Sequence, residues 1–136
     1  MVDPEVIAVA TVARPELRAY DQAIRLPFPA LVAELRDILG VRLVAYLGTV
    51  KETRAVHEWS DGKRAPSVLI RRRLRESYVI AGMLAQADPP EVVRAWFQGL
   101  NPLLDDRSPA RLLREAEIDD VAPQVLAAAR SFLANG

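Results

Sequence analysis

The stretch LVAYLGTVKETRAVHEWSDGKRAPS, residues 43–67, decides the fold. Its apolar residues repeat at helical spacing in two short segments that are separated by a tight turn. In the second segment Val56 and Trp59 lie one turn apart, so both side chains point toward the core. Gly48 ends the first segment, and we expect it to adopt the positive φ that glycine tolerates. Two short helices joined in this way predict a helix-turn-helix.

The outward face of this segment is basic. Residues 51–76 contain eight Lys and Arg against four acids, whereas residues 1–50 and 77–136 carry net charges of −1 and −3. The whole chain has no net charge. A polyanion is therefore expected to meet the middle of the chain, where the local excess of positive charge lies.

A basic helix face above a buried apolar face can enter the major groove of DNA. The residues predicted to contact DNA are Lys51, Thr53, Arg54, His57, Lys63 and Arg64. Arg54 and His57 are placed to approach base edges, and the other cations to hold phosphates. The arginines of residues 71–75 are expected to contact the DNA backbone or to form salt bridges. The alternative interpretation is a solvated basic face on an ordinary two-helix hairpin.

The rest of the chain shows recurring helix signals and almost no strand signals, which predicts an all-α fold. Residues 1–14 form a weakly patterned arm that we expect to be flexible or to be ordered by a partner; IAVATV at residues 7–12 could pair as a short strand, but no neighbouring segment offers an obvious pairing partner. Pro15 suits the first turn of a short helix. Ser67 can cap a longer helix that runs to about residue 86. Further helices are predicted on both sides of these segments.

The predicted organisation is a helix-turn-helix lobe followed by a small helical lobe. We expect an N-terminal arm with a short helix at residues 1–27, the helix-turn-helix domain and a connecting helix at residues 28–87, and a second lobe at residues 88–136. A hydrophobic content of 51% is enough to build a core for a chain of this length.

Composition argues against several classes of function. The chain has no cysteine and one histidine, so thiolate and multi-histidine metal sites are excluded. There is no glycine-rich phosphate loop and no HExxH pattern, and we predict no catalytic residues, no cofactor and no enzyme activity. No run reaches the ~18 to 20 apolar residues of a membrane span. We therefore expect a cytoplasmic protein without a membrane partner.

Residues 43–67 resemble the Xre-type helix-turn-helix. The second helix of that family tends to run V-x-x-W-x-x-G-x-x-x-P, and this spacing is met by Val56, Trp59, Gly62 and Pro66. The resemblance implies a dimeric DNA-binding domain.

The stretch VVRAWFQGLNPLLDDRSPARLL, residues 92–113, resembles the toxin-binding domain of the Xre/MbcA/ParS-like antitoxins. In that domain an aromatic pair precedes an Asn-Pro turn, a leucine, a proline and a helix, and those places are taken by Trp96, Phe97, Asn101, Pro102, Leu104, Ser108, Pro109 and Leu112. We expect the Asn101 side chain to satisfy backbone groups of the turn. The toxin-binding residues that the resemblance implies are Trp96, Asn101, Leu103, Leu104, Arg107, Arg111, Leu112 and Arg130. For the aromatic residues, core packing is an equally good interpretation.

The two resemblances together imply a type II antitoxin. Its cognate toxin would carry a RES domain and deplete NAD, and the antitoxin would neutralise it by direct binding and repress its own operon by binding operator DNA. A homodimer and a hetero-oligomer with the toxin are expected. Two alternatives stay open: a stand-alone dimeric helix-turn-helix repressor that uses residues 77–136 only to dimerise, and a toxin-neutralising module whose helix-turn-helix no longer touches DNA.

Overall fold

The computed structural model describes the backbone of residues 4–135 and the side chains of residues 15–135. In this part the chain forms α1 (Pro4–Arg25), α2 (Phe28–Leu39), α3 (Val41–Leu47), α4 (Thr53–Ser60), α5 (Val68–Ala85), α6 (Pro90–Gln98), the 3-10 turn η1 (Pro102–Leu104), α7 (Pro109–Glu115) and α8 (Ile118–Asn135). The predicted all-α class is confirmed. Among the described residues, no helix combines the length and the apolar character that a membrane span requires.

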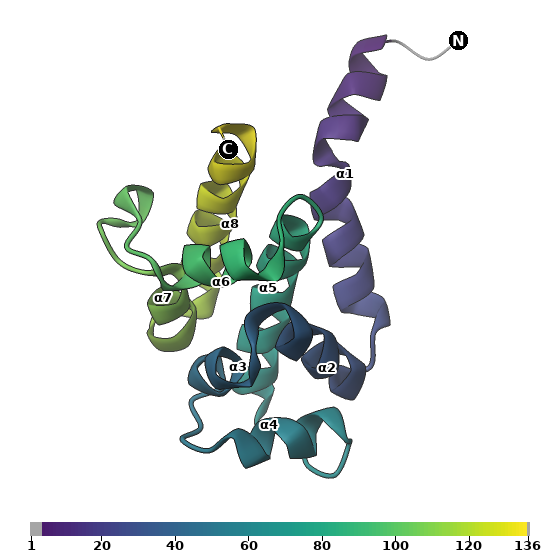
Figure 1. The fold of residues 1–136 in the computed structure, drawn as a ribbon. Coiled ribbons are helices and arrows are strands. Elements are labelled where there is room, and N and C mark those ends of the chain that lie inside the picture. The colour runs from purple at the N-terminus through teal and green to yellow at the C-terminus, as the bar shows by residue number, and fades with distance from the viewer. Residues whose placement is uncertain (1–3, 136) are drawn as a thin grey trace.

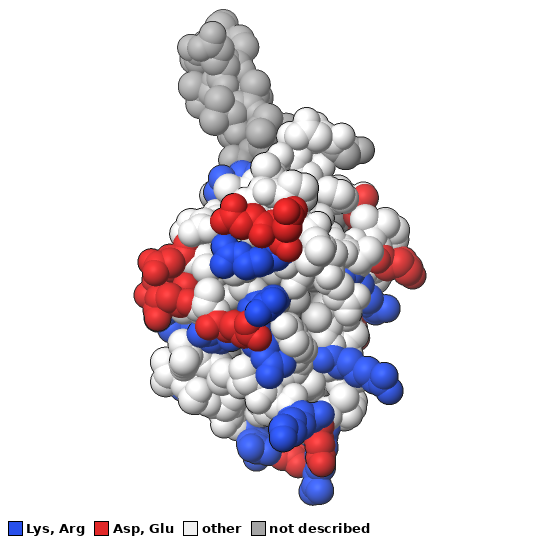
Figure 2. Space-filling view, turned by 90° about the vertical axis from the view of Figure 1, so that its left-hand side faces the viewer, with Lys and Arg blue, Asp and Glu red and all other residues white. Residues whose placement is uncertain are grey.

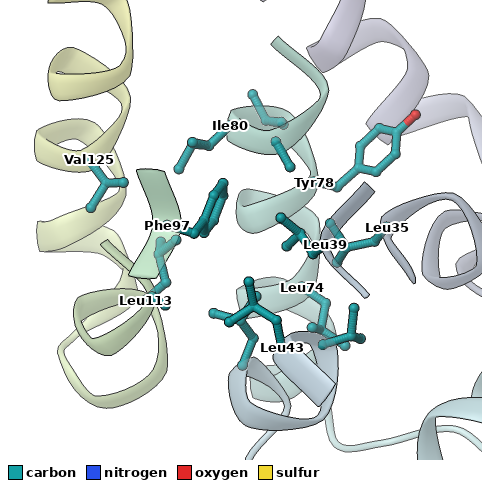
Figure 3. Packing of buried hydrophobic residues seen from close by; sticks show 14 of the residues in the cluster. Leu35, Leu39, Leu43, Leu74, Tyr78, Ile80, Phe97, Leu113 and Val125 are labelled. Atoms are coloured by element: carbon teal, nitrogen blue, oxygen red, sulfur yellow. The ribbon is translucent and has the colours of Figure 1, made fainter. Parts of the chain in front are cut away.

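Helix α5 runs through the middle of the molecule, with α1 and α2 on one side and α6, α7 and α8 on the other (Figure 1). Buried side chains on both of its sides belong to one hydrophobic cluster. Figure 3 shows this arrangement: the Tyr78 side chain of α5 points to the side where Leu35 lies, and Phe97 and Val125 lie on the other side of α5. The helix-turn-helix and the C-terminal helices therefore share a core, and the division of the chain into domains stays a prediction.

The start of α5 follows from its local sequence. The Ser67 hydroxyl accepts a hydrogen bond from the Ile70 backbone N–H at 3.3 Å, which confirms the predicted cap. Deeper in the helix the Arg73 side chain is buried and donates to the Leu113 carbonyl at 2.8 Å. That carbonyl belongs to the last turn of α7, where partial negative charge of the helix dipole favours a cation. Arg73 thus ties the central helix to the C-terminal part.

The prediction for the N-terminal segment is wrong. Helix α1 starts at Pro4 and continues to Arg25, so residues 7–12 are helical rather than extended and Pro15 lies inside the helix. Residues 1–3 lie outside the described part. A proline within a helix removes one hydrogen bond, and packing offsets this loss. The small side chains of Ala19 and Ala23 are buried in the contact between α1 and α5.

Polar contacts add to this packing of α1. Arg130 of α8 donates to both carboxylate oxygens of Glu16, at 2.8 and 3.2 Å. The Tyr78 hydroxyl, on α5, donates to Glu34 at 2.5 Å and lies 3.0 Å from the Gln22 side-chain oxygen. Burial and the neighbouring Glu34 raise the pKa of the Tyr78 hydroxyl. The phenol therefore stays protonated and joins α1, α2 and α5.

Glu76 gives the fold a testable pH dependence. It lines a hollow between α1, α5 and α8, where burial and the nearby Asp119 raise its pKa while Arg72 lowers it. A carboxyl whose pKa is raised on folding stabilises the fold below its unfolded pKa, and this contribution is lost as the pH rises through the folded pKa. We expect Glu76→Gln to increase the free energy of unfolding at neutral pH and to lose this advantage in acid.

Urea unfolding of both proteins at neutral and acidic pH measures this difference. A stabilisation of equal size at both pH values, or a destabilised variant at neutral pH, would contradict the prediction.

Candidate nucleic-acid and partner-binding surfaces

The two helices predicted over residues 43–67 are α3 and α4. Val56 and Trp59 are buried as expected, and Trp59 is 1% exposed. The prediction for Gly48 is wrong, because its φ is −83° and Thr49 adopts the left-handed conformation at φ 57°. Glycine is needed at position 48 for a different reason: a Cβ there would lie 2.7 Å from Cη2 of Trp59. The close approach of the indole ring, not the turn, selects the glycine.

Backbone hydrogen bonds fix the turn between the two helices. The N–H groups of Gly48, Thr49 and Val50 donate to carbonyls of α3, at 2.9, 3.1 and 3.0 Å. The left-handed conformation costs a non-glycine residue of order 1 kcal/mol in free energy. The hydrogen bonds of the turn therefore hold Thr49 in a conformation that its own backbone disfavours. The bonds set the direction in which the chain leaves toward Lys51.

The predicted DNA-binding residues share one surface around α4. Lys51, Arg54, His57, Lys63 and Arg64 are exposed and Thr53 is half-buried. Figure 2 shows that Lys and Arg predominate at the lower end of this face, near α4, and that acidic side chains gather higher up. The fold therefore brings together the cations that were predicted to bind DNA.

Within residues 15–135, one acid forms ion pairs with these cations. Glu58 accepts a hydrogen bond from Arg54 at 2.9 Å and lies 3.9 Å from Arg64, while the Arg54 side chain stays 84% exposed. Exposed ion pairs contribute less than about 1 kcal/mol, so phosphates can replace Glu58 at little cost. His57 faces α2, where Arg36 Nη1 lies 3.5 Å from its Nδ1. Of the two residues predicted to approach base edges, Arg54 is therefore the more accessible.

The arginines of residues 71–75 serve the fold. Arg72 forms an ion pair with Asp119 of α8, and Arg75 donates to the Ala23 carbonyl of α1. With the buried Arg73, three of these side chains connect α5 to neighbouring helices. The predicted salt bridge is present for Arg72, whereas Arg73 and Arg75 bond to carbonyls of the protein, and contact of these arginines with a DNA backbone stays a prediction.

The loop after α6 is organised by Asn101. Its side-chain oxygen accepts a hydrogen bond from the Leu103 N–H at 2.9 Å, as predicted. Its backbone carbonyl accepts from Leu104 and Asp106, and its N–H donates to the Arg107 carbonyl at 3.2 Å. Asp105 and Asp106 both adopt left-handed conformations, with φ of 56° and 57°. The loop is thus held in one shape, which lowers the entropic cost of binding a partner.

Two leucines project from this loop into solvent. Leu103 is 64% exposed and Leu100 is 75% exposed. Leu103 is among the predicted partner-binding residues, but Leu100 was not predicted. The available signal was a leucine placed directly after Gly99, where the amphipathic helix α6 has ended and no helical face can bury it. Exposed apolar side chains on a rigid loop are typical of a protein-binding site.

Other predicted partner-binding residues lie inside the molecule or are paired. Leu104 and Leu112 are 2% and 3% exposed, so their prediction as contact residues is corrected: both side chains belong to the hydrophobic core. Arg107 and Arg111 are exposed, and each forms an ion pair with a nearby acid, Asp105 and Glu115 respectively. Arg130 pairs with Glu16 of α1.

The aromatic pair divides between core and surface. Phe97 is fully buried, whereas Trp96 is half-buried. The Trp96 ring meets Phe97 edge to face at 5.5 Å and lies 6.4 Å from Phe132 of α8. Trp96 therefore packs at the edge of the core and keeps part of its ring accessible. Among residues with described side chains, no three His, Asp or Glu gather to hold a metal ion.

Curated relatives of this chain are mycobacterial. It is 35% identical over 68 residues to the mycobacterial cidal antitoxin MbcA of Mycobacterium bovis, and the same values hold for MbcA of two strains of Mycobacterium tuberculosis. The match covers 50% of this chain and 60% of each relative, which is less than two thirds of their length. No family model matches the chain.

A solved structure extends the likeness beyond the matched sequence. A chain in the crystal structure of the M. tuberculosis MbcT–MbcA toxin–antitoxin complex superposes with a TM-score of 0.60 and 28% sequence identity. The superposition covers 76% of this chain and 94% of that chain.

Proposed function

We propose that this chain, a homologue of the MbcA antitoxins over half of its length, is itself the antitoxin of a toxin–antitoxin system. The observation that carries the proposal is the similarity to nearly the whole of a chain from a toxin–antitoxin complex, at 28% identity. The preformed loop with exposed Leu100 and Leu103 supports it, because such a loop suits a protein partner.

The proposed partner is a toxin with a RES domain that depletes NAD in the cytoplasm. The antitoxin needs no catalytic group for this role, since covering the entrance to the toxin's active site prevents substrate from entering. The apolar loop supplies the central contact, and the exposed cations Arg107 and Arg111 lie in the segment that follows it. Complementary charges at the rim of such an interface favour correct association.

Coexpression with the product of the neighbouring gene tests the proposal. We expect the neighbour to arrest growth and lower cellular NAD when expressed alone, and expect this chain to restore both and to co-purify with it. If this chain neither restores growth nor binds the neighbour, the antitoxin proposal fails. A chain that is isolated alone and shifts operator DNA would instead be a stand-alone repressor.

We also propose that the basic surface around α4 binds the operator of its own gene. Support comes from the shared exposure of Lys51, Arg54, Lys63 and Arg64 and from the weak pairing of the arginines with Glu58. A recognition helix as short as α4 reads few base pairs, so a homodimer that binds two half-sites is part of this proposal.

Arg54→Glu is expected to abolish operator binding and to leave toxin binding unchanged. The change replaces an exposed cation by an anion that repels both the phosphates and Glu58. Binding is measured at low salt, where electrostatic attraction is strongest.

The matched control is Arg25→Glu. Arg25 also pairs with an acid one turn away, Asp21 at 3.0 Å, so the variant has the same change in net charge and a similar local repulsion on a different helix. Equal DNA affinity of the two variants would assign the effect to net charge and contradict the proposed surface. If the unaltered chain binds the toxin but no DNA, the protein would be a toxin-neutralising module whose helix-turn-helix does not contact DNA.

A further inference from the structure

Cationic side chains from both halves of the chain meet at one open cleft. The cleft has a volume of about 700 Å3, and the cations in its wall are Arg42 of α3, Lys51 in the turn before α4, Arg54 in the first turn of α4, and Arg114 of α7. Glu52 is the acid in the same wall. Four positive groups against one negative group leave a clear excess of positive charge in a concave site, where the potential is focused.

Most of this charge has no internal counterpart. Within residues 15–135, the salt bridges include only one of the four cations, Arg54, which pairs with Glu58. Arg42, Lys51 and Arg114 have no carboxylate partner in that part of the chain. Surface cations that stabilise a fold are usually paired or dispersed, and a cluster of unneutralised cations indicates an anionic ligand.

Arg114 reaches the cleft from outside the helix-turn-helix. Its guanidinium carbon lies 4.4 Å from the centroid of the Tyr46 ring, and α7 packs against α3 (Figure 1). Stacking on the ring uses one face of the guanidinium and leaves its edge donors free for a planar, two-pronged contact with an oxyanion. Tyr46 therefore holds Arg114 in position at the cleft.

The cleft continues along the predicted DNA-binding surface. A neighbouring hollow of about 450 Å3 shares Lys51, Glu52 and Arg54 with it and is also lined by Glu58 and Arg64. The cations of α3, α4 and α7 thus form one track rather than separate points. A track of this kind matches the repeated charges of a nucleic-acid backbone better than a single small anion.

We propose that this cleft binds backbone phosphate of DNA, and that Arg114 is one of its phosphate ligands. The inference rests on the operator-binding part of the proposed function. It adds a contact from α7, in the second lobe predicted at residues 88–136, and assigns Tyr46 as the positioning residue for Arg114. The contact carries no base specificity.

The experiment measures the salt dependence of binding to a duplex from the region upstream of the gene and to a shuffled duplex. Each phosphate contact contributes about 0.9 to the slope of log affinity against log salt concentration. We expect Arg114→Gln to reduce the slope by about this amount on both duplexes. Tyr46→Leu is expected to produce part of the same reduction, and Tyr46→Phe, which keeps the ring, to behave like the unaltered chain.

Arg111→Gln is the matched control, because Arg111 lies on the same helix but pairs with Glu115 and does not line the cleft. An unchanged slope in Arg114→Gln, together with loss of binding in Arg54→Glu, would overturn this inference and leave operator binding intact. A reduction in Arg111→Gln as large as that in Arg114→Gln would also overturn it. If the unaltered chain binds neither duplex at low salt, operator binding and the cleft's role fail together.

Discussion

Alanine at position 48 is expected to destabilise the fold by about 3 kcal/mol, the upper end of the usual cost of overpacking a core. A Cβ on Gly48 would lie 2.7 and 2.8 Å from two carbons of the Trp59 ring and 3.3 Å from the Val44 carbonyl oxygen. The ring is rigid and 1% exposed, so it cannot move aside without disturbing the core. Urea unfolding measures the loss as a lower midpoint with an unchanged slope.

Gly82→Ala provides the matched control with the opposite expected sign. Gly82 lies inside α5, and a Cβ there would meet the Ala19 side chain at 3.7 Å, an ordinary contact. Replacing a glycine by alanine within a helix stabilises by roughly 0.5–1 kcal/mol. Destabilisation of similar size in both variants would contradict the explanation for position 48.

A double variant tests the mechanism directly. Phenylalanine at position 59 lacks the ring atoms that crowd position 48, so Trp59→Phe should restore part of the stability lost in Gly48→Ala. Residues in contact show such non-additive effects, whereas independent sites do not. Purely additive losses would show that the two residues do not interact in the way described.

Much of the fold could be predicted from periodicity and local signals. The inward positions of Val56 and Trp59, one helical turn apart, predicted α4. Ser67 and Asn101 act in the structure as their residue types suggest, one as a helix cap and the other within a turn. These features depend on neighbours a few residues away, which is why the sequence discloses them.

Two predictions were wrong where local signals did not show what the rest of the chain does. Pro15 suggested a helix start, but α1 continues on both sides of it, and the part after Pro15 packs against α5 through Ala19 and Ala23. Gly48 suggested a left-handed turn, but a ring eleven positions later determines the residue there. Local rules cannot reveal either effect.

The candidate site shows the same limit. The arginines near residue 73 were expected to contact the DNA backbone or to form salt bridges, and the sequence could not tell which; three of them bond to other helices. Conversely, Arg114 gave no signal in the sequence, because only the fold places it beside Tyr46 and the cations of α4. Leu104 and Leu112 match a partner-binding pattern in sequence and are buried in the structure.

The largest functional effect is expected from charge in the loop after α6. In the double variant Leu100→Asp/Leu103→Asp, two exposed apolar side chains become anions that a partner would have to desolvate. Loss of two central contacts typically costs about 2 kcal/mol each, which together lowers affinity close to a thousandfold. Co-purification with the proposed toxin and rescue of growth should both be lost.

The fold should tolerate this change, because both leucines are exposed and the hydrogen bonds of Asn101 involve backbone groups of the loop. Leu17→Asp/Ile24→Asp is the matched control: these side chains on α1 are also well exposed, and the variant introduces the same two charges on another helix. Toxin binding is expected to survive in the control, and in Arg54→Glu as well. If the α1 variant loses the toxin while the loop variant keeps it, the partner surface lies on α1 and not on the Asn101 loop, since net charge is equal in the two proteins.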